Sequence, residues 1–191
     1  MTSFSGFLQL GIDHILDTQG YDHILFVIVL SAIYPMKDWK KIVILVTAFT
    51  IGHSLTLALS ATGLLKINAG LVETLIPITI MVTGLLNVYK IYTGTLYEGK
   101  ILLNYILASC FGLIHGLGFS NYFKAILGQE ASILQPLLAF NLGVELGQIF
   151  IVIGAVAIST LFIEMVRIPA KYWAAFISIL AIIIAGTLLI G

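Results

Sequence analysis

The sequence predicts an all-α membrane protein, a polytopic bundle of six transmembrane helices. Hydrophobic residues make up 60% of the 191 positions and charged residues only 9%, and the mean hydropathy is +1.10. Soluble globular domains carry about 25% charged residues. Several apolar runs are also long enough to cross about 30 Å of hydrocarbon. Because a helix satisfies its backbone hydrogen bonds within one segment, a helical bundle is the structure that such runs predict.

The apolar runs define the expected spans, which together form a single transmembrane domain over residues 1–191. The six runs cover residues 20–35, 39–62, 69–92, 100–119, 133–162 and 169–190. Residues 4–17 alternate apolar and polar side chains too often for a span and are predicted to form a short amphipathic or re-entrant helix, which would bring the count to seven. Residues 121–131 are a candidate for another short helix of this kind.

The basic residues set the expected orientation, since Lys and Arg collect in cytoplasmic loops. If the N-terminus is outside, only Lys66 and Lys124 lie outside with it. The other seven then fall on the cytoplasmic side: Lys37, Lys40, Lys41, Lys90, Lys100, Arg167 and Lys171. Both termini are therefore predicted to face the exterior.

Charge and cysteine content exclude several classes of partner and site. The net charge is zero, whereas binding to nucleic acid requires a basic surface. Cys110 is the single cysteine, so one chain can form neither an internal disulfide nor a thiolate cluster. Within its apolar run, Cys110 is predicted to be a small core residue. The N-terminus lacks a basic region and a cleavage motif, so it is expected to belong to the mature protein.

Residues 11–26, GIDHILDTQGYDHILF, contain one hexapeptide pattern twice and place His14 nine residues before His23. Nine residues along a continuous helix leave two side chains about half a turn apart, so these imidazoles would point in opposite directions. The sequence DTQG at 17–20 offers turn chemistry. A helix break there would let both imidazoles point inward.

The histidines and two acids are predicted to share the outer half of the membrane. At 1.5 Å per residue, His23, His53 and His115 lie roughly 18 to 22 Å from the cytoplasmic lysines of their helices. Ionisable groups at such depth are costly unless they are paired or ligated, so they indicate a functional site. Imidazole and carboxylate ligands suit divalent Zn, Ni, Co or Fe. The predicted metal ligands are His14, Asp22, His23, His53, His115 and Glu145.

Other polar residues fall on matching helix faces and are predicted to support this site. They are Ser54, Glu73, Asn141 and Gln148. Interhelical hydrogen bonding without any ligand is the alternative role for each of them. The small residues around His115, in FGLIHGLGF, are expected to let two helices approach closely.

Five segments taken in order resemble the HupE/UreJ family of small bacterial membrane proteins. They are GIDHILDTQGYDHILF, FTIGHSLTLALS, VETLIPITI, FGLIHGLGF and FNLGVELGQ. The resemblance implies six or seven membrane helices, a multi-pass location in the bacterial inner (cytoplasmic) membrane, and uptake of nickel or a related divalent metal. The residues that match by position are His14, Asp22, His23, His53, Ser54, Glu73, His115, Asn141 and Glu145. Seven residues separate His14 from Asp22, more than in the better-studied nickel members, so the chain resembles a distinct branch.

Two classes of function follow from these residues. The first is a permease that captures a divalent metal from outside and releases it inward. The alternative is an intramembrane zinc metallohydrolase acting at the outer leaflet, with Glu145 or Asp22 as general base and catalytic residues otherwise unassigned. A third possible function is that of a metal sensor or chaperone. The expected partners are the metal ion and membrane lipids. The sequence does not distinguish a monomer from a homo-oligomer, because GLIHGLG could pack within the bundle or between protomers.

Overall fold

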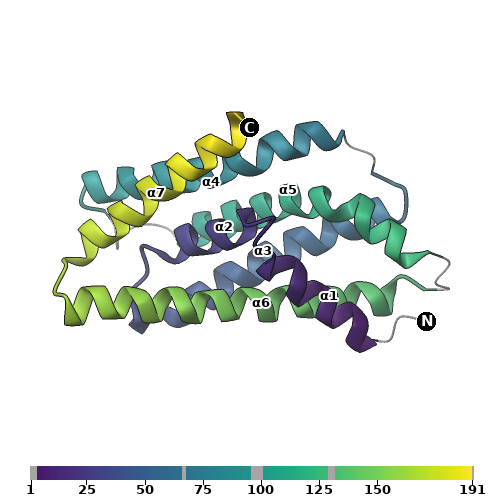
Figure 1. Cartoon of the computed structure of the whole chain (residues 1–191), viewed down its shortest axis with the longest axis horizontal. Helices are drawn as coiled ribbons and strands as arrows, with labels where there is room; N and C mark the ends of the chain where they lie inside the picture. The colour runs from purple at the N-terminus through teal and green to yellow at the C-terminus, as the bar shows by residue number, and fades with distance from the viewer. Residues whose placement is uncertain (1–3, 66–67, 96–100, 129–131, 191) are drawn as a thin grey trace.

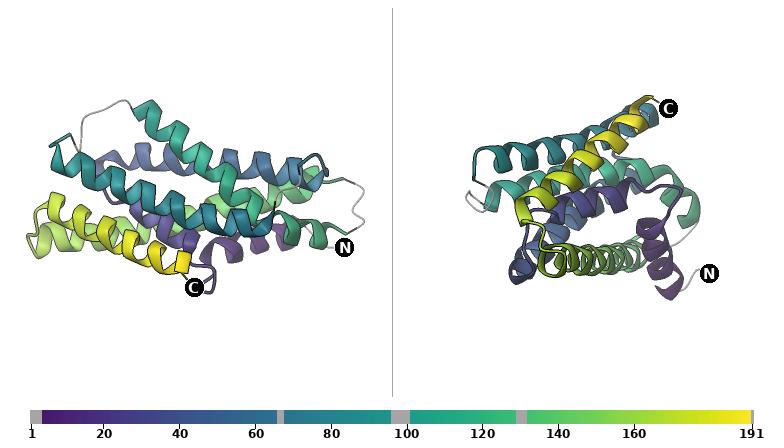
Figure 2. Two further views of the ribbon diagram at one scale, coloured as in Figure 1. Left: turned by 90° about the horizontal axis from the view of Figure 1, so that it is seen from above. Right: turned by 60° about the vertical axis from the view of Figure 1, so that its left-hand side comes forward.

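The computed structural model is a bundle of helices aligned roughly along one long axis (Figures 1 and 2). It describes residues 4–65, 68–95, 101–128 and 132–190, and these ranges contain helices and connecting segments but no strand. The all-α prediction is therefore confirmed. The helices are α1 (Phe4–Leu16), α2 (Asp22–Ser31), the 3-10 turn η1 (Met36–Asp38), α3 (Trp39–Ala61), α4 (Ala69–Tyr92), α5 (Ile101–Leu127), α6 (Leu134–Thr160), the π-turn η2 (Leu161–Met165) and α7 (Ala170–Ile190).

In the part of the chain that the structure describes, five helices are long and apolar enough to cross a membrane: α3 with η1, α4, α5, α6 with η2, and α7. Large apolar side chains such as Ile51, Leu85 and Phe150 lie exposed on their outer faces, as expected for helices surrounded by lipid. Cys110 is also exposed, so its prediction as a core residue was wrong. An apolar run does not distinguish a side chain that faces lipid from one that faces the core.

The first predicted span, residues 20–35, differs from the structure. The helix α2 covers only 10 residues, or about 15 Å, which is too short to cross a bilayer alone. Figure 1 shows α1 and α2 following one another along the bundle, with a break between them. The Asp17 carboxylate accepts a hydrogen bond from the Gln19 amide at 2.8 Å, a turn that competes with continuation of the helix. Residues 4–31 thus form one discontinuous helical path rather than a surface helix followed by a full span.

The fourth predicted span was also drawn too short. The helix α5 continues without interruption to Leu127 and ends beside Gly128, whose φ of +54° suits glycine. No separate helix therefore follows residue 121, and residues 129–131 lie outside the described ranges. Gly112 and Gly116 lie inside the helix, as in the predicted span, and a neighbouring helix packs directly against them.

Glycines bring two pairs of helices into backbone contact. A Cβ atom added to Gly112 of α5 would collide with the Phe49 carbonyl of α3, and one added to Gly11 of α1 would collide with the Phe140 carbonyl of α6. Such small-residue contacts are the usual packing device within membranes. The expectation of close approach near His115 is confirmed. One tight pair, α3 and α5, carries His53 and His115, and the other, α1 and α6, carries His14.

Gly112→Ala is expected to lower the stability of the bundle by about 1–3 kcal/mol, because the added methyl group must displace the α3 backbone. Thermal unfolding of the detergent-solubilised protein measures the effect. Gly154→Ala is the matched control, since a Cβ atom there meets nothing within 4 Å. Equal melting temperatures for the two variants would show that the α3–α5 contact tolerates a methyl group.

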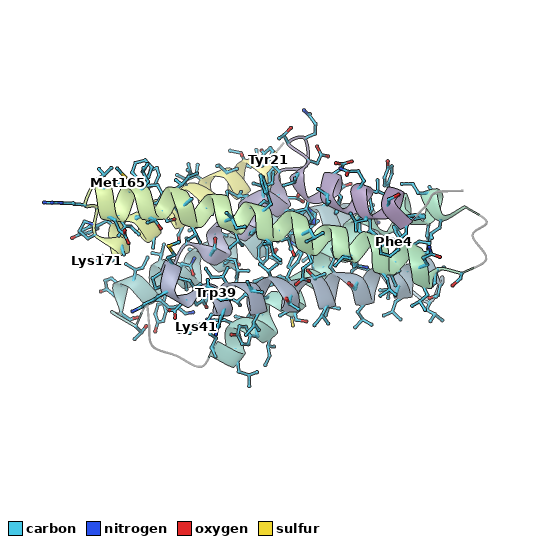
Figure 3. All side chains as sticks on the ribbon, turned by 90° about the horizontal axis from the view of Figure 1, so that it is seen from below. Phe4, Tyr21, Trp39, Lys41, Met165 and Lys171 are labelled. Carbon is cyan, nitrogen blue, oxygen red and sulfur yellow. The ribbon has the colours of Figure 1, made fainter. Side chains whose placement is uncertain are left out.

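The basic residues gather at the end of the bundle opposite the N-terminus. Figure 3 shows Lys41 and Lys171 at that end, far from Phe4. Lys37, Lys40, Lys90 and Arg167 belong to the same turns and helix ends, and Lys124 lies near the opposite end of α5. This is the distribution that the predicted orientation requires. Lys66 and Lys100 lie outside the described ranges.

Candidate metal centre

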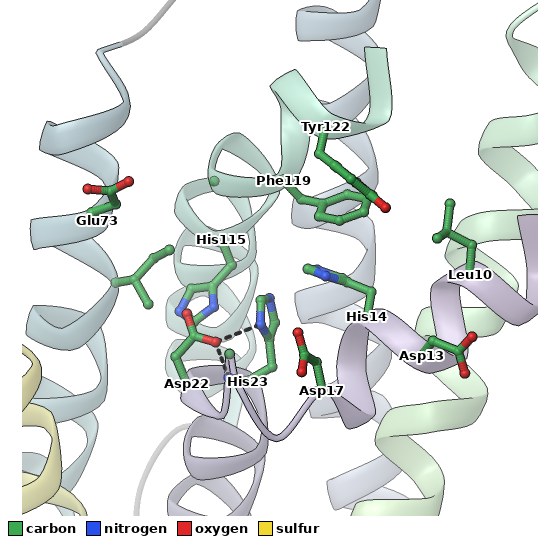
Figure 4. Close-up of a pocket in the computed structure, with 13 residues that line it drawn as sticks. Leu10, Asp13, His14, Asp17, Asp22, His23, Glu73, His115, Phe119 and Tyr122 are labelled. Atoms are coloured by element: carbon green, nitrogen blue, oxygen red, sulfur yellow. Dashed lines mark hydrogen bonds and ion pairs between the residues drawn. The ribbon is translucent and has the colours of Figure 1, made fainter. Parts of the chain in front are cut away.

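The four histidines converge at the break between α1 and α2, and Figure 4 shows three of them, His14, His23 and His115. The ring centroids of His14 and His23 lie 4.6 Å apart, although the two residues are nine positions apart in the sequence. His115 of α5 lies 4.9 Å from His23, and His53 of α3 lies 5.9 Å from His14. The break turns α2 so that the imidazole at its start faces the imidazole at the end of α1.

Among the described residues, two overlapping groups of side chains could hold a metal ion. His14, His23 and His53 form one group, and Asp22, His23 and His115 form the other; within each group the ligand atoms all lie within 4.8 Å of one another. His23 belongs to both groups. Nitrogen and carboxylate oxygen without thiolate is a ligand set that suits Zn, Ni and Co.

Hydrogen bonds fix the orientation of two imidazoles and decide which nitrogen carries the lone pair. His23 Nδ1 lies 3.0 Å from Asp22 Oδ1, so this nitrogen donates a proton and leaves Nε2 as the basic atom. The Thr79 hydroxyl donates to the Ile76 carbonyl at 2.7 Å. Its oxygen can therefore only accept from His115 Nε2, which lies 3.1 Å away, and the lone pair of His115 is on Nδ1.

The side-chain amide of Asn141 fixes the tautomer of His53 in the same way. Asn141 Nδ2 donates to the Leu137 carbonyl at 2.8 Å, which directs its oxygen toward the imidazole. Asn141 Oδ1 lies 3.4 Å from His53 Nδ1 and accepts its proton. The lone pair of His53 is consequently on Nε2. Histidines that ligate metals typically donate their other ring N–H to such an acceptor, which fixes the tautomer in this way.

The three nitrogens that carry these lone pairs, and one nitrogen of His14, are buried without a partner. Within the described residues, His14 Nε2, His23 Nε2, His53 Nε2 and His115 Nδ1 make no hydrogen bond. Leaving a buried acceptor unsatisfied costs about 1–3 kcal/mol per group. Four such atoms around one break fit the presence of a cation, because a bound metal ion would use all or most of these lone pairs.

Aromatic rings enclose the imidazoles. The ring centroid of Phe119 lies 3.9 Å from that of His14, and Phe140 stacks on His53 at 6.2 Å. Phe49 meets His115 edge to face at 5.1 Å. This apolar wall lowers the local dielectric constant beside the rings and strengthens electrostatic interactions there.

A cavity of about 720 Å³ connects the imidazoles to the surface. His14, His23 and His115 line its deep end, with Phe119 and Tyr122 beside them. Four carboxylates also line it: Asp13, Asp17, Asp22 and Glu73. A cleft lined by one sign of charge concentrates ions of the opposite sign, so this cavity attracts cations.

The remaining predicted residues lie in different surroundings. Glu73 is exposed at the cavity wall. Ser54 donates to the Thr50 carbonyl of its own helix. Glu145 and Gln148 belong to neither group of possible ligands. Glu145 accepts a hydrogen bond from Thr47, and the Gln148 amide lies 2.8 Å from the Thr50 hydroxyl.

Sequence reasoning missed Thr79 and the enclosing Phe119. The pair Thr79 and Thr83, four residues apart within an apolar helix, was the available signal for Thr79. Its contact with a residue 36 positions away could not be derived from helical spacing alone.

Comparison with known proteins gives one match. A family model described as HupE / UreJ protein matches residues 1–190, nearly the whole chain. Neither the curated proteins nor the solved structures contain a significant match. The resemblance drawn from the five sequence segments is therefore confirmed.

Proposed function

Because this chain belongs to the HupE/UreJ family, which is known for membrane proteins related to nickel and cobalt transport, we propose that it is a permease for a divalent transition metal. The observation that carries the proposal is the convergence of four buried, unpartnered imidazole nitrogens at a helix break. The cargo is a nickel, cobalt or zinc ion. The ligands that we propose are His14, Asp22, His23, His53 and His115.

The position of the site supports transport. Transporters typically bind their ions near the middle of the membrane, at helices that are interrupted there. His115 lies 14 residues from the start of α5 and 12 from its end. The break between α1 and α2 supplies the interrupted helix. The carbonyl groups at the end of α1 add negative potential beside the site, which favours a cation.

Polar contacts close the bundle between the site and the basic end. Asn104 of α5 donates to the Tyr34 hydroxyl at 2.7 Å and accepts from Lys90 of α4 at 3.0 Å. Asn87 of α4 donates to the Val29 carbonyl of α2 at 2.8 Å. We take this arrangement as the outward-open state, in which the cavity admits the ion and these contacts hold α2 against α4 and α5. Release would require α2 to separate from them.

Metal uptake into proteoliposomes tests the proposal. Vesicles that contain the wild-type protein are expected to accumulate Ni²⁺, Co²⁺ or Zn²⁺, and His115→Ala is expected to reduce the initial rate to the level of empty vesicles. Cys110→Ser, a change at an exposed position, is the control and should transport normally. If well-folded His115→Ala transports as fast as the wild type, the imidazoles do not carry the ion.

The carboxylates at the cavity mouth are expected to increase the rate of capture. The double variant Asp17→Asn, Glu73→Gln should lower uptake at limiting metal by about tenfold, the lower end of the range for electrostatic steering, with little change at saturation. Asn at position 17 can still accept the Gln19 amide, so the turn is retained. Asp38→Asn, at the opposite end of the bundle, is the matched control. A loss that does not diminish with added salt would contradict steering.

A zinc metallohydrolase is the second candidate, favoured by one observation. A cavity of about 190 Å³ lies beside Asp22, between Tyr21, Pro77 and Leu188, and could admit an apolar substrate to a metal-bound water. Asp22 would then serve as general base, since it lines this cavity and Glu145 does not. Hydrolysis of lipid or peptide by the purified protein, abolished by a chelator and restored by Zn²⁺, would favour this candidate over the permease.

A further inference from the structure

One face of α6 continues the polar lining from the imidazoles toward the basic end of the bundle. Asn141 contacts His53, and Gln148 and Ser159 follow at spacings of seven and eleven residues, which return to nearly the same side of a helix. Glu145 lies on the flank of this face. Ser159 lines a cavity of about 100 Å³ at the basic end. The imidazole centre uses Asn141 but leaves the rest of this face without a role.

Glu145 is a carboxylate within a membrane-length helix. It is half-buried and accepts a hydrogen bond from the Thr47 hydroxyl of α3. Among the described residues, ion pairs join Asp22 to His23 and Asp38 to Lys41, and neither pair includes Glu145. A carboxylate at membrane depth without a cationic partner is costly and marks ion pathways in other membrane proteins.

Gln148 adds a buried amide with an unpartnered atom. Its side chain is 0% exposed, and its Nε2 has no partner among the residues that the structure describes. Thr50 Oγ1 lies 2.8 Å from the amide oxygen and 3.2 Å from the Val46 carbonyl, but one hydroxyl proton cannot serve both acceptors. If the side-chain amide of Gln148 is flipped so that its oxygen and nitrogen exchange places, the nitrogen donates to Thr50 and Thr50 donates to the Val46 carbonyl. The amide oxygen then occupies the unpartnered position as a free acceptor.

We propose that Thr47, Thr50, Glu145 and Gln148 form a second, oxygen-donor site for the divalent cation on its inward route. Thr50 and Thr47 lie three and six residues before His53 on α3, or about 4.5 and 9 Å toward the basic end. This inference rests on the proposed permease function. It gives the ion a binding step between the imidazoles and the inner cavity.

The two sites differ in their chemistry. Imidazole suits the late first-row divalent metals, whereas carboxylate and carbonyl oxygen suit harder cations such as Mg²⁺, Ca²⁺ and Mn²⁺. The oxygen site should therefore hold Ni²⁺, Co²⁺ or Zn²⁺ more weakly than the histidines do. Conduction requires sites that are favourable enough to enter and weak enough to leave. A weaker second site promotes release.

Equilibrium dialysis of the full-length protein in detergent against Co²⁺ tests the inference. The wild type is expected to bind two Co²⁺ per chain, one tightly and one weakly. Glu145→Gln should retain the tight ion and weaken the second at least tenfold, whereas His23→Ala should lose the tight ion and retain the weak one. Asp38→Asn, whose carboxylate pairs with Lys41 away from α6, should bind both ions normally. If Glu145→Gln does not fold, Thr47→Val, which removes one oxygen donor, should weaken the second ion several-fold.

Three results would overturn the second site: a single Co²⁺ on the wild type, unchanged affinities in Glu145→Gln, or loss of both ions in a folded Glu145→Gln protein. The last would place Glu145 in the imidazole centre. The proposed function fails on a separate measurement, the absence of metal uptake by wild-type proteoliposomes. Stoichiometry and uptake therefore distinguish the two failures.

Discussion

His23→Ala is expected to abolish tight metal binding. His23 belongs to both groups of possible ligands, so its removal leaves at most two of the remaining side chains in each. Its ring also donates a hydrogen bond to the Asp22 carboxylate at 3.0 Å, and this carboxylate loses that partner in the variant. The affinity should fall by more than the roughly 10–100-fold that loss of a ligand's hydrogen-bond partner costs. Equilibrium dialysis with Zn²⁺ measures the change.

The other histidines provide a graded comparison for His23→Ala. His14→Ala and His115→Ala each remove a member of a single group, so each should weaken binding less than His23→Ala does. Phe119→Leu removes an aromatic contact of His14 without removing a ligand and should bind metal nearly as well as the wild type. A well-folded His23→Ala protein that binds Zn²⁺ with unchanged affinity would show that the imidazoles are structural.

The sequence predicted the convergence of the histidines better than it predicted the helices that produce it. Repetition of Asp-His after nine residues, together with DTQG, was enough to infer a break, because half a turn of mismatch can be removed only by interrupting the helix. Hydropathy could not show that Asp22–Ser31 is a short helix, since apolar residues continue to Pro35 in either case. The prediction took the whole apolar run of residues 20–35 to be one helix.

Depth and partners were harder to derive. Glu145 was grouped with the histidines because its position along the helix placed it in the same outer half of the membrane, but helical rise fixes only the position along the axis and not the neighbour that a side chain faces. In the structure its partner is Thr47, six residues from His53. The glycines of FGLIHGLGF had a different outcome, because their prediction as a packing surface is confirmed by the contact with α3. Contact with α3 outweighs the low helix propensity of glycine there.

Thr79→Val is expected to weaken metal binding by about 10–100-fold, although Thr79 would not touch the metal. Its oxygen accepts the proton of His115 Nε2 at 3.1 Å, which keeps the lone pair on Nδ1, the buried and unpartnered nitrogen of that ring. Valine has the same shape but accepts nothing, so the imidazole can rotate or place its proton on Nδ1, where it would block the ligand position. Zn²⁺ affinity measured by dialysis reports the loss.

Thr83→Val separates this effect from a general loss of packing. Thr83 lies one turn further along α4, is 6% exposed compared with 3% for Thr79, and donates to the carbonyl of Thr79 within its own helix. The two substitutions remove the same hydroxyl group from the same helix at similar burial, and only one of them removes a partner of an imidazole. Thr83→Val should therefore retain wild-type affinity, and Thr79→Ser, which restores the acceptor oxygen, should recover most of the loss. Equal weakening in Thr79→Val and Thr83→Val would mean that α4 packing, and not the orientation of His115, governs the site.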